Sequence, residues 1–234
     1  MADKNFVRSM FNNIAPTYDK LNHILSLNID KIWRKKAVKR ICKNLSNSEA
    51  HVLDVACGTA DSSIALAKAG IPFVTGVDIS EGMIKVGEEK IKSLNLNNIN
   101  LKVEDCENLS FEDNSFDSAF IAFGIRNFED KKKGLNELRR VLKDNGHLLI
   151  LELSVPQNKI LLSLYKLYFL HILPFIGKKI SGDSKAYTYL PNSVMNFPKP
   201  KEFMAIMEEC GFKNVKQKAL TFGLCRIYEG FVIS

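Results

Sequence analysis

Short apolar runs alternate with segments of helical spacing along most of the chain. The apolar runs predict strands at 51–56, 72–80, 99–107, 116–124 and 146–154. The segments between them predict helices at 59–70, 80–94 and 131–144. The run at 146–154 is nearly all apolar, which is typical of a central parallel strand covered on both faces. This alternation predicts a doubly wound, mostly parallel α/β sheet.

The last part of the chain predicts how the sheet is completed. A helix at 200–212 is expected to stop at Gly211, because glycine adopts the left-handed conformation that ends many helices. Two further runs, 213–220 and 225–233, are expected to form a closing antiparallel pair. The prediction is therefore a seven-stranded sheet with a terminal antiparallel strand.

The composition fits one folded domain. Of the 234 residues, 46% are hydrophobic and 25% are charged, which is ordinary for a folded protein and enough for one sizeable core. We expect a single domain at 1–234, with an N-terminal helical segment at 1–46 and an inserted apolar helical segment at 156–195. No linker, repeat or signal-peptide core interrupts this pattern.

The cysteines, histidines and charges narrow the function classes. Five scattered cysteines without a CxxC pair predict a reduced, cytoplasmic compartment, and four histidines without ligand spacing predict no metal. The formal net charge is +7, and many of the cations crowd one segment. That cluster comprises Lys31, Arg34, Lys35, Lys36, Lys39, Arg40 and Lys43. Such a cluster is most often a solvated face, and it also suits phosphates or an anionic leaflet.

The first strand-to-helix turn, DVACGTAD at 54–61, is where a doubly wound sheet binds its ligand. Gly58 permits a tight turn with close backbone approach, and Thr59 and Asp61 can begin the helix. A dinucleotide pyrophosphate favours three glycines and bare amides at this turn, whereas this one offers a single glycine and the carboxylates Asp54 and Asp61. S-adenosylmethionine has no phosphate and carries a sulfonium and an ammonium cation, so acids at this turn favour it.

Acidic residues also stand at the carboxyl ends of the second and third predicted strands. Asp78 can accept hydrogen bonds from both ribose hydroxyls. Asp105, with Cys106 beside it, can accept the exocyclic amine of adenine while a backbone amide meets the ring. Each acid alone would be read as a helix cap or a solvated loop residue. Because they occur in register after successive strands, they predict a class I methyltransferase that uses S-adenosylmethionine.

Five segments of the chain resemble the bacterial C-methyltransferases of menaquinone and ubiquinone biosynthesis. They are YDKLNHILSLNIDKIW (18–33), GIRNF (124–128), RVLKDNGHLLILELS (140–154), YTYLPNSVMNFP (187–198) and LTFGLCRIYEG (220–230). The likeness begins at FNNIAPTYD and runs over essentially the whole chain. It implies methylation of a ring carbon on a prenylated hydroquinone, most typically demethylmenaquinol to menaquinol, with the benzoquinol of ubiquinone biosynthesis as the alternative. It also implies that 1–46 is a lid over the substrate.

The chain departs from the family pattern at several positions. Asp30 stands where histidine is usual, Leu21 replaces methionine, and Asp144-Asn145 replaces a proline-glycine turn. Cys57 and Ala60 replace customary glycines of the first turn. Asparagine and aspartate still suit a turn. The methyl group of Ala60 is expected where the methionine part of the cofactor passes, so it bears on cofactor affinity.

The strand predicted at 116–124 is followed closely by Arg126 and Asn127. A charged residue at a strand end is ordinary where the chain meets solvent. In a C-methyltransferase, however, ionising a ring hydroxyl makes the adjacent ring carbon nucleophilic. Arginine keeps its proton, so Arg126 is expected to stabilise the phenolate and orient a water that removes the ring proton, while Asn127 holds that water or the second ring oxygen. Tyr18 alone would be read as a packed aromatic, but it resembles a family lid residue that covers cofactor and quinol.

The apolar stretch 159–180 is too short and too interrupted to span a bilayer. Its interruptions are Lys166, His171 and Pro174. One interpretation is a buried helix that covers the sheet. The other is that Tyr165, Phe169 and their neighbours line a groove for an isoprenoid tail, with basic residues on anionic lipid. The second interpretation expects peripheral contact with the inner face of the membrane.

Three other function classes stay open on the sequence. A methyltransferase acting on oxygen or nitrogen would keep the cofactor turn but has no use for the quinone-family segments. An RNA methyltransferase would suit the positive charge, yet the chain shows no added RNA-binding module, and we expect no nucleic-acid partner. A non-catalytic lipid-binding scaffold would not need Asp78, Asp105 and Arg126 together. A homodimer is compatible with the sequence, which does not decide the oligomeric state.

Overall fold

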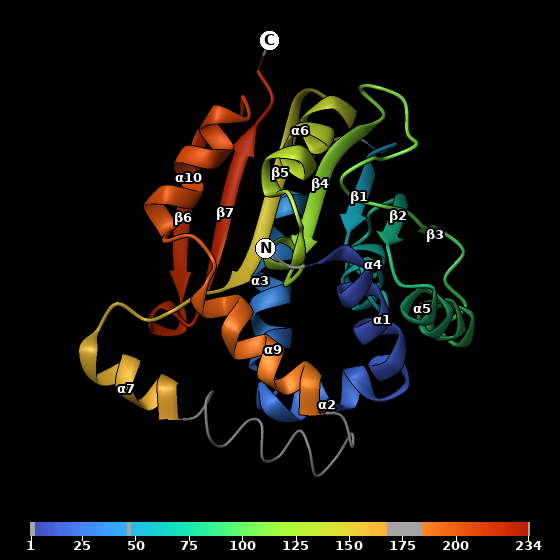
Figure 1. Cartoon of the computed structure of the whole chain (residues 1–234). Helices are drawn as coiled ribbons and strands as arrows, with labels where there is room; N and C mark the ends of the chain where they lie inside the picture. The colour runs from blue at the N-terminus through green and yellow to red at the C-terminus, as the bar shows by residue number, and fades with distance from the viewer. Residues whose placement is uncertain (1–2, 46–47, 168–183, 234) are drawn as a thin grey trace.

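The structure is a computed structural model that describes residues 3–45, 48–167 and 184–233. Seven strands form one sheet in the order β3-β2-β1-β4-β5-β7-β6 (Figure 1). They are β1 (His51–Val55), β2 (Phe73–Asp78), β3 (Ile99–Val103), β4 (Phe116–Ala122), β5 (Leu142–Leu153), β6 (Lys213–Leu220) and β7 (Cys225–Phe231). Strand β7 runs antiparallel to both β5 and β6, and the pairs from β3 across to β5 are parallel. The predicted doubly wound sheet with its terminal antiparallel strand is therefore confirmed.

Helices cover the faces and the carboxyl edge of this sheet (Figure 1). The α-helices in the described part of the chain are α1 (Lys4–Ile14), α2 (Tyr18–Leu25), α3 (Ile29–Asn44), α4 (Asp61–Lys68), α5 (Glu81–Ser93), α6 (Lys131–Val141), α7 (Lys159–Leu167), α9 (Ser184–Met195) and α10 (Pro200–Glu209). Short 3-10 turns are η1 (Ala15–Thr17), η2 (Ile125–Asn127) and η4 (Thr221–Gly223).

The central strands of the sheet are buried on both faces, as their apolar sequences predict. One face packs against α6 and α10, where Leu138 and Phe203 are buried. The other face packs against α3 and α4, where Ile41 is buried. Successive side chains of a strand point to opposite faces, so Ile121 joins the first cluster and its neighbour Phe120 the second. This double burial holds the carboxyl ends of the strands rigidly in place.

The predicted boundaries around β5 are wrong. The helix expected to reach 144 ends at Val141, and β5 begins at Leu142 rather than at 146. Leu142 already pairs with Phe116 of β4, and the amide of Asn145 donates to the carbonyl of Val232 at 2.9 Å. These neighbouring segments hold the chain in the sheet earlier than its local turn residues suggest. Asn145 keeps a left-handed φ of 60°, which asparagine tolerates.

The described part of segment 1–46 is mostly helical, as expected, and its helices α1 and α2 lie at the carboxyl edge of the sheet (Figure 1). Helix α1 docks on the first turn of α5. There Asn12 Oδ1 accepts a hydrogen bond from the amide of Gly82 at 2.9 Å and one from the hydroxyl of Ser80 at 2.7 Å. The N-terminal segment therefore lies over the ends of the strands at which the sequence places a ligand.

The inserted segment contributes α7 and α9 at the same edge (Figure 1). Of the residues singled out in the stretch 159–180, Phe169, His171 and Pro174 lie outside the described residues. Tyr165 is buried and faces a cavity at this edge. In the described ranges, no helix is both long and apolar enough to cross a membrane.

Candidate active site

Two cavities open side by side at the carboxyl edge of the sheet. The larger has a volume of about 400 Å³ and the smaller about 80 Å³. Both are lined by the same central residues, which are Tyr18, Ala56, Gly58, Ala122 and Phe123. The two cavities therefore form one divided cleft over the ends of β1 and β4.

The turn after β1 adopts the tight conformation that its glycine predicts. Gly58 has a φ of 56°, and Ala56 and Ala60 are also left-handed, at 54° and 66°. A left-handed alanine costs about 1 kcal/mol, so the surrounding fold must hold this turn in place. The ring of Tyr18 lies over the turn, with its Cε1 4.0 Å from where a Cβ on Gly58 would be. The sequence-predicted lid residue thus covers the sequence-predicted cofactor turn.

The methyl group of Ala60 does not enter the cleft, so the expectation that it lies along the path of the cofactor is wrong. Ala60 is fully buried and lines neither of the two cavities. Its methyl group packs with Ile64 and Ile91 and lies 3.2 Å from where a Cβ on Gly87 of α5 would be. Because Gly87 has no side chain, α5 leaves room for this methyl group behind the turn. The alanine therefore fills a gap in the core instead of entering the cleft.

The smaller cavity brings together Gly58, Asp78, Asp105, Cys106 and Asn127. Asp78 ends β2, and its carboxylate accepts the amides of Gly58 and Ser80, each at 2.9 Å. Burial raises the pKa of Asp78, although these amide hydrogen bonds oppose the shift. Each carboxylate oxygen has room for a second donor, so Asp78 both fixes the turn and keeps acceptor capacity toward the cavity.

Asp105 follows β3, which ends at Val103 and not at 107 as predicted. Its carboxylate accepts the amide of Glu107 at 2.9 Å and the ammonium group of Lys4 at 2.6 Å. Lys4 lies in the first turn of α1, so the N-terminal helix reaches the far end of the smaller cavity. Beside it, burial raises the pKa of the Cys106 thiol, which therefore stays protonated.

Asp54 lines neither cavity, although the sequence places it in the cofactor turn. It is completely buried beneath the turn, where Oδ2 accepts the hydroxyl of Ser63 at 2.6 Å. Burial raises the pKa of Asp54 to about 7. Any contact of Asp54 with a ligand is therefore indirect, through the turn that it supports.

The raised pKa of Asp54 makes stability depend on pH. Because the folded state binds this proton more tightly than the unfolded chain, its stabilising contribution is fully present below pH 3.8 and is lost as the pH rises to about 7. Asp54→Asn is neutral at every pH and can still accept the Ser63 hydroxyl. We expect the free energy of unfolding of Asp54→Asn, relative to the natural chain, to rise across this window by at most about 4 kcal/mol. Urea unfolding of both proteins between pH 4.5 and 8 checks this, and a constant difference would contradict it.

Arg126 lies in η2, just past the end of β4. Its side chain is buried beside the larger cavity and forms an ion pair with Glu152 of β5, with Nη1 2.8 Å from Oε1. Nη1 also donates to the carbonyl of Phe123, and Nε donates to Ser193 Oγ at 3.3 Å. Burial alone would lower the pKa of Arg126, but Glu152 and the nearby tyrosines raise it above the ordinary value. Arg126 is therefore a fixed, permanently charged donor and not a base.

The other two predicted catalytic residues flank Arg126. Asn127 lines the smaller cavity, and its Oδ1 accepts the hydroxyl of Tyr189 at 3.1 Å. Tyr18 lines both cavities, and burial raises the pKa of its phenol against the opposing effect of Arg126. The structure thus brings Tyr18, Arg126 and Asn127 to the boundary between the two cavities.

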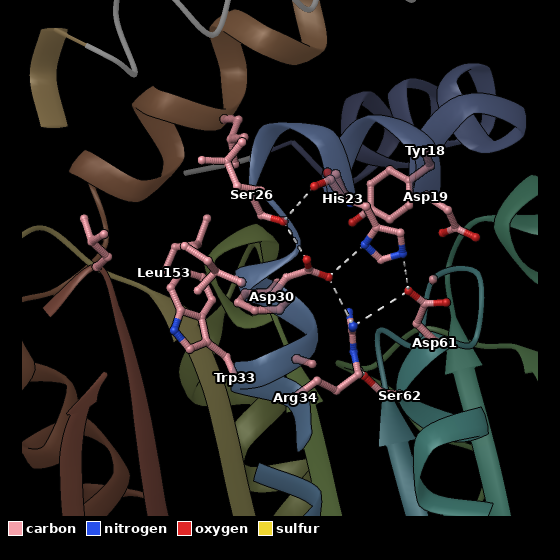
Figure 2. Close-up of a pocket in the computed structure, with 18 of the residues that line it drawn as sticks. Tyr18, Asp19, His23, Ser26, Asp30, Trp33, Arg34, Asp61, Ser62 and Leu153 are labelled. Atoms are coloured by element: carbon pink, nitrogen blue, oxygen red, sulfur yellow. Dashed lines mark hydrogen bonds and ion pairs between the residues drawn. The ribbon is translucent and has the colours of Figure 1, made fainter. Parts of the chain in front are cut away.

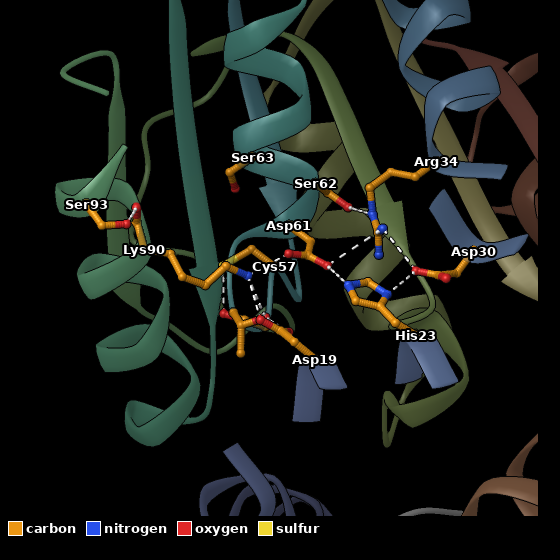
Figure 3. Close-up of polar contacts among 12 residues, drawn as sticks. Asp19, His23, Asp30, Arg34, Cys57, Asp61, Ser62, Ser63, Lys90 and Ser93 are labelled. Carbon is orange, nitrogen blue, oxygen red and sulfur yellow. Dashed lines mark hydrogen bonds and ion pairs between the residues drawn. The ribbon is translucent and has the colours of Figure 1, made fainter. Parts of the chain in front are cut away.

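A network of charged residues ties the N-terminal helices to the turn after β1 (Figures 2 and 3). His23 of α2 lies between two carboxylates, with Nδ1 3.0 Å from Asp30 Oδ2 and Nε2 3.5 Å from Asp61 Oδ2. Arg34 of α3 reaches the same two carboxylates at 3.3 and 3.7 Å. Burial alone would raise the pKa of Asp61, but Arg34 and other cations hold it below the ordinary value. Asp30, the departure from the family pattern, is thus a member of this network.

A second cation, Lys90, holds α2 to the turn after β1. Lys90 of α5 lies 2.7 Å from Asp19 Oδ2 in α2 and 2.5 Å from Asp61 Oδ1 (Figure 3). Asp19 also accepts the hydroxyl of Thr59, the predicted cofactor residue that lines the larger cavity. Helix α2 is therefore tied to the turn after β1 through Thr59 and Asp61.

Removing Lys90 is expected to loosen the lid without unfolding the domain. In Lys90→Met, Asp19 and Asp61 lose a shared cation, and two partly exposed ion pairs of this kind contribute about 1 kcal/mol in total. We expect hydrogen exchange of the α2 amides to quicken about fivefold, and high salt to quicken it in the natural chain as well. Lys68→Met, which changes an exposed lysine at the end of α4, is the matched control. Equal exchange in both variants would show that Lys90 does not fasten the lid.

The residues that pair with the predicted site residues were not predicted from the sequence. Glu152 had a signal, because it is the one charged residue in the apolar run 146–154, and a carboxylate there needs a buried cation. Lys4 and Lys90 had none, because an exposed-looking lysine on an amphipathic helix is ordinary until its neighbours in space are known. His23 had none either, because a single histidine without metal-ligand spacing forms no recognisable pattern.

Known proteins resemble this chain over nearly its whole length. The model of the ubiE/COQ5 methyltransferase family matches residues 1–232. A demethylmenaquinone methyltransferase from Bacteroides fragilis is 45% identical over 224 residues, which cover 95% of this chain and 90% of that protein. A ubiquinone/menaquinone biosynthesis C-methyltransferase (UbiE) from Geobacter sulfurreducens is 44% identical over 227 residues, covering 96% of this chain and 87% of the relative.

Solved structures share the fold at low sequence identity. The [4+2]-cyclase SpnF superposes with a TM-score of 0.71 at 14% identity, covering 97% of this chain and 96% of that one. A SAM-dependent methyltransferase from Aquifex aeolicus superposes with a TM-score of 0.59 at 20% identity, covering 84% and 89%. These likenesses establish the fold alone, because one fold supports different chemistries. The family model and the curated relatives identify the family, and the chain belongs to the ubiE/COQ5 methyltransferase family.

Proposed function

We propose that this chain methylates a ring carbon of demethylmenaquinol and so produces menaquinol. The reaction class follows from the family, which carries out S-adenosylmethionine-dependent C-methylation in menaquinone and ubiquinone biosynthesis. The observation that supports the site is the placement of Arg126. A buried, permanently charged donor lies at the boundary between the smaller cavity, which contains Asp78 and Asp105, and the larger one.

The residues of the smaller cavity fit S-adenosylmethionine. Asp78 keeps acceptor capacity for the two ribose hydroxyls, and Asp105 lies where it can accept the adenine amine beside Lys4. The turn at Gly58 allows close backbone approach, and Thr59 at the larger cavity suits the amino-acid end of the molecule. When bound, S-adenosylmethionine supplies an electrophilic methyl group on a sulfonium cation.

The quinol ring fits at the boundary between the cavities. Arg126 would stabilise the phenolate oxygen formed when the ring hydroxyl ionises, which raises electron density on the neighbouring carbon. Glu152 holds the guanidinium in place, so the donor is oriented before the substrate arrives. Asn127 would fix the second ring oxygen or the water that takes the ring proton, and Tyr189 orients the Asn127 amide. Tyr18 would cover the ring and exclude bulk water.

The larger cavity suits an isoprenoid tail. Its apolar lining includes Trp33, Leu153, Leu161, Tyr165, Leu190 and Leu224. A volume of about 400 Å³ lies within the range of small-molecule pockets and accommodates the start of a tail but not a long one. The rest of the tail would leave through the mouth of the cavity. We therefore expect the enzyme to work in the cytoplasm at the inner face of the membrane.

The quinone pool of a strain lacking this gene tests the substrate directly. We expect a naphthoquinone lighter by one methyl group to accumulate, and the gene to restore the full mass. Accumulation of a demethylated benzoquinone would instead assign the chain to ubiquinone biosynthesis. An unchanged quinone pool would contradict both substrates.

A further inference from the structure

Bulky apolar side chains project into solvent at the mouth of the larger cavity. Among the described residues, the three most exposed large apolar side chains are Leu27 at 77%, Ile160 at 74% and Phe222 at 82%. Leu27 lies between α2 and α3, Ile160 in α7, and Phe222 in the turn between β6 and β7. Leu27 and Phe222 line the cavity, as does Leu161 beside Ile160. We call Leu27, Ile160 and Phe222 the apolar rim.

Two members of the apolar rim are held in unfavourable backbone conformations. Leu27 has a φ of 52° and Phe222 a φ of 56°, a region that bulky residues rarely occupy. Asparagine or glycine would serve such a turn at lower cost. The turns instead direct a leucine and a phenylalanine outward, where neither contributes to the core. Strain of this kind is typical of a surface with a function.

Exposed lysines lie on both sides of Leu27 in the sequence. Lys20 of α2 and Lys31 and Lys35 of α3 are exposed, and Ile32 between them is also 55% exposed. Figure 1 shows α2 and α7 at the edge of the molecule where the parallel strands end. Apolar tips beside exposed lysines match the layers of an anionic bilayer, with hydrocarbon beneath negatively charged headgroups. A second copy of the chain meeting this face about a twofold axis would instead bring the same lysines against one another.

We propose that the apolar rim inserts into the surface of an anionic bilayer, so that the larger cavity opens toward the hydrocarbon. Leu27 and Phe222 enter the boundary between headgroups and acyl chains, while Lys20, Lys31 and Lys35 contact the headgroups. The inference rests on the proposed function, because a prenylated quinol has to pass from the bilayer into the cavity. It assigns membrane contact to the cavity mouth itself.

Vesicle co-sedimentation tests the apolar contacts. The probes are vesicles of phosphatidylcholine alone and of phosphatidylcholine with about one third phosphatidylglycerol. We expect Leu27→Ser and Phe222→Ser each to weaken binding to the anionic vesicles about tenfold, since each removes a large side chain from hydrocarbon. Phe73→Ser is the matched control, because Phe73 is 54% exposed at the start of β2, at the opposite edge of the sheet. Equal vesicle binding by the natural chain, Phe222→Ser and Phe73→Ser would overturn the proposal. It would also be overturned if Phe222→Ser left vesicle binding unchanged and altered the molecular mass in solution, because the rim would then be an interface between copies of the chain.

Variants of the lysines and of Ile160 test membrane binding separately from methyl transfer, because these residues do not line the cavities. We expect Lys31→Gln combined with Lys35→Gln to bind anionic vesicles about tenfold more weakly, with little change on neutral ones. Ile160→Ser and this double variant are expected to methylate a soluble, tail-less demethylnaphthoquinol at the natural rate but a vesicle-embedded substrate more slowly. Natural rates on both substrates would overturn the rim proposal and leave the proposed function standing. No methylation of any quinol by the natural chain would refute the proposed function, whatever the vesicles show.

Discussion

Arg126→Lys is expected to lower turnover of the quinol about a hundredfold or more while the affinity for S-adenosylmethionine changes little. Lysine keeps the positive charge but presents a single ammonium group, so it cannot hold Glu152, the Phe123 carbonyl and a phenolate in the geometry of the guanidinium. Removing one oriented donor to a developing anion typically costs this much in rate. Arg126 lines the larger cavity and not the one that holds Asp78, so binding of the methyl donor should survive.

The measurement is single-turnover methyl transfer with purified protein, together with titration calorimetry for S-adenosylmethionine. Arg126→Ala alone is a poor test, because it leaves Glu152 buried without its cation and is expected to destabilise the fold by about 3 to 5 kcal/mol. The double variant Arg126→Gln with Glu152→Gln removes both charges, so that neither residue is left as an unpaired buried ion. It should fold, bind the methyl donor and fail to turn over. Full turnover by that double variant would remove Arg126 from the mechanism.

Asp78→Ala is expected to weaken binding of S-adenosylmethionine about a hundredfold or more. The variant loses a charged acceptor for two ribose hydroxyls, and hydrogen bonds to charged groups contribute about 1.5 to 3 kcal/mol each. It also releases the amides of Gly58 and Ser80, which Asp78 holds at 2.9 Å, so the turn after β1 becomes looser. Both effects act in the same direction on affinity.

Titration calorimetry with S-adenosylmethionine checks this, with Glu81→Gln as the matched control. Glu81 is an exposed carboxylate in the first turn of α5, three residues from Asp78, and it lines neither cavity. Its variant should bind the methyl donor with natural affinity. An Asp78→Ala protein that keeps its fold and binds within a few-fold of the natural chain would show that the ribose lies elsewhere.

The sheet and its cofactor edge were predictable from the sequence because both depend on local pattern. Apolar runs of strand length placed β1 to β5, and Asp78 and Asp105 follow their strands in register, so parallel strands bring them to one edge. The boundary at Leu142 was missed because pairing with Phe116 and Val232, far away in the chain, overrides the local turn residues.

The departures from the family pattern could be located in the sequence but not interpreted. Whether the Ala60 methyl enters the cleft depends on the gap that Gly87 leaves in α5. The role of Asp30 depends on His23, Arg34 and Asp61, which come from three helices. Such contacts join residues between 4 and about 40 positions apart and leave no periodic trace in the chain.

Methyl transfer from labelled S-adenosylmethionine to reduced demethylmenaquinone tests the whole account most directly. With purified protein, we expect one labelled methyl group per quinol, attached to a ring carbon, as mass spectrometry of the product fragments would show. A label on a ring oxygen would contradict C-methylation. No transfer at all, in a protein that binds a nicotinamide dinucleotide at this cleft instead, would refute the cofactor and the reaction together.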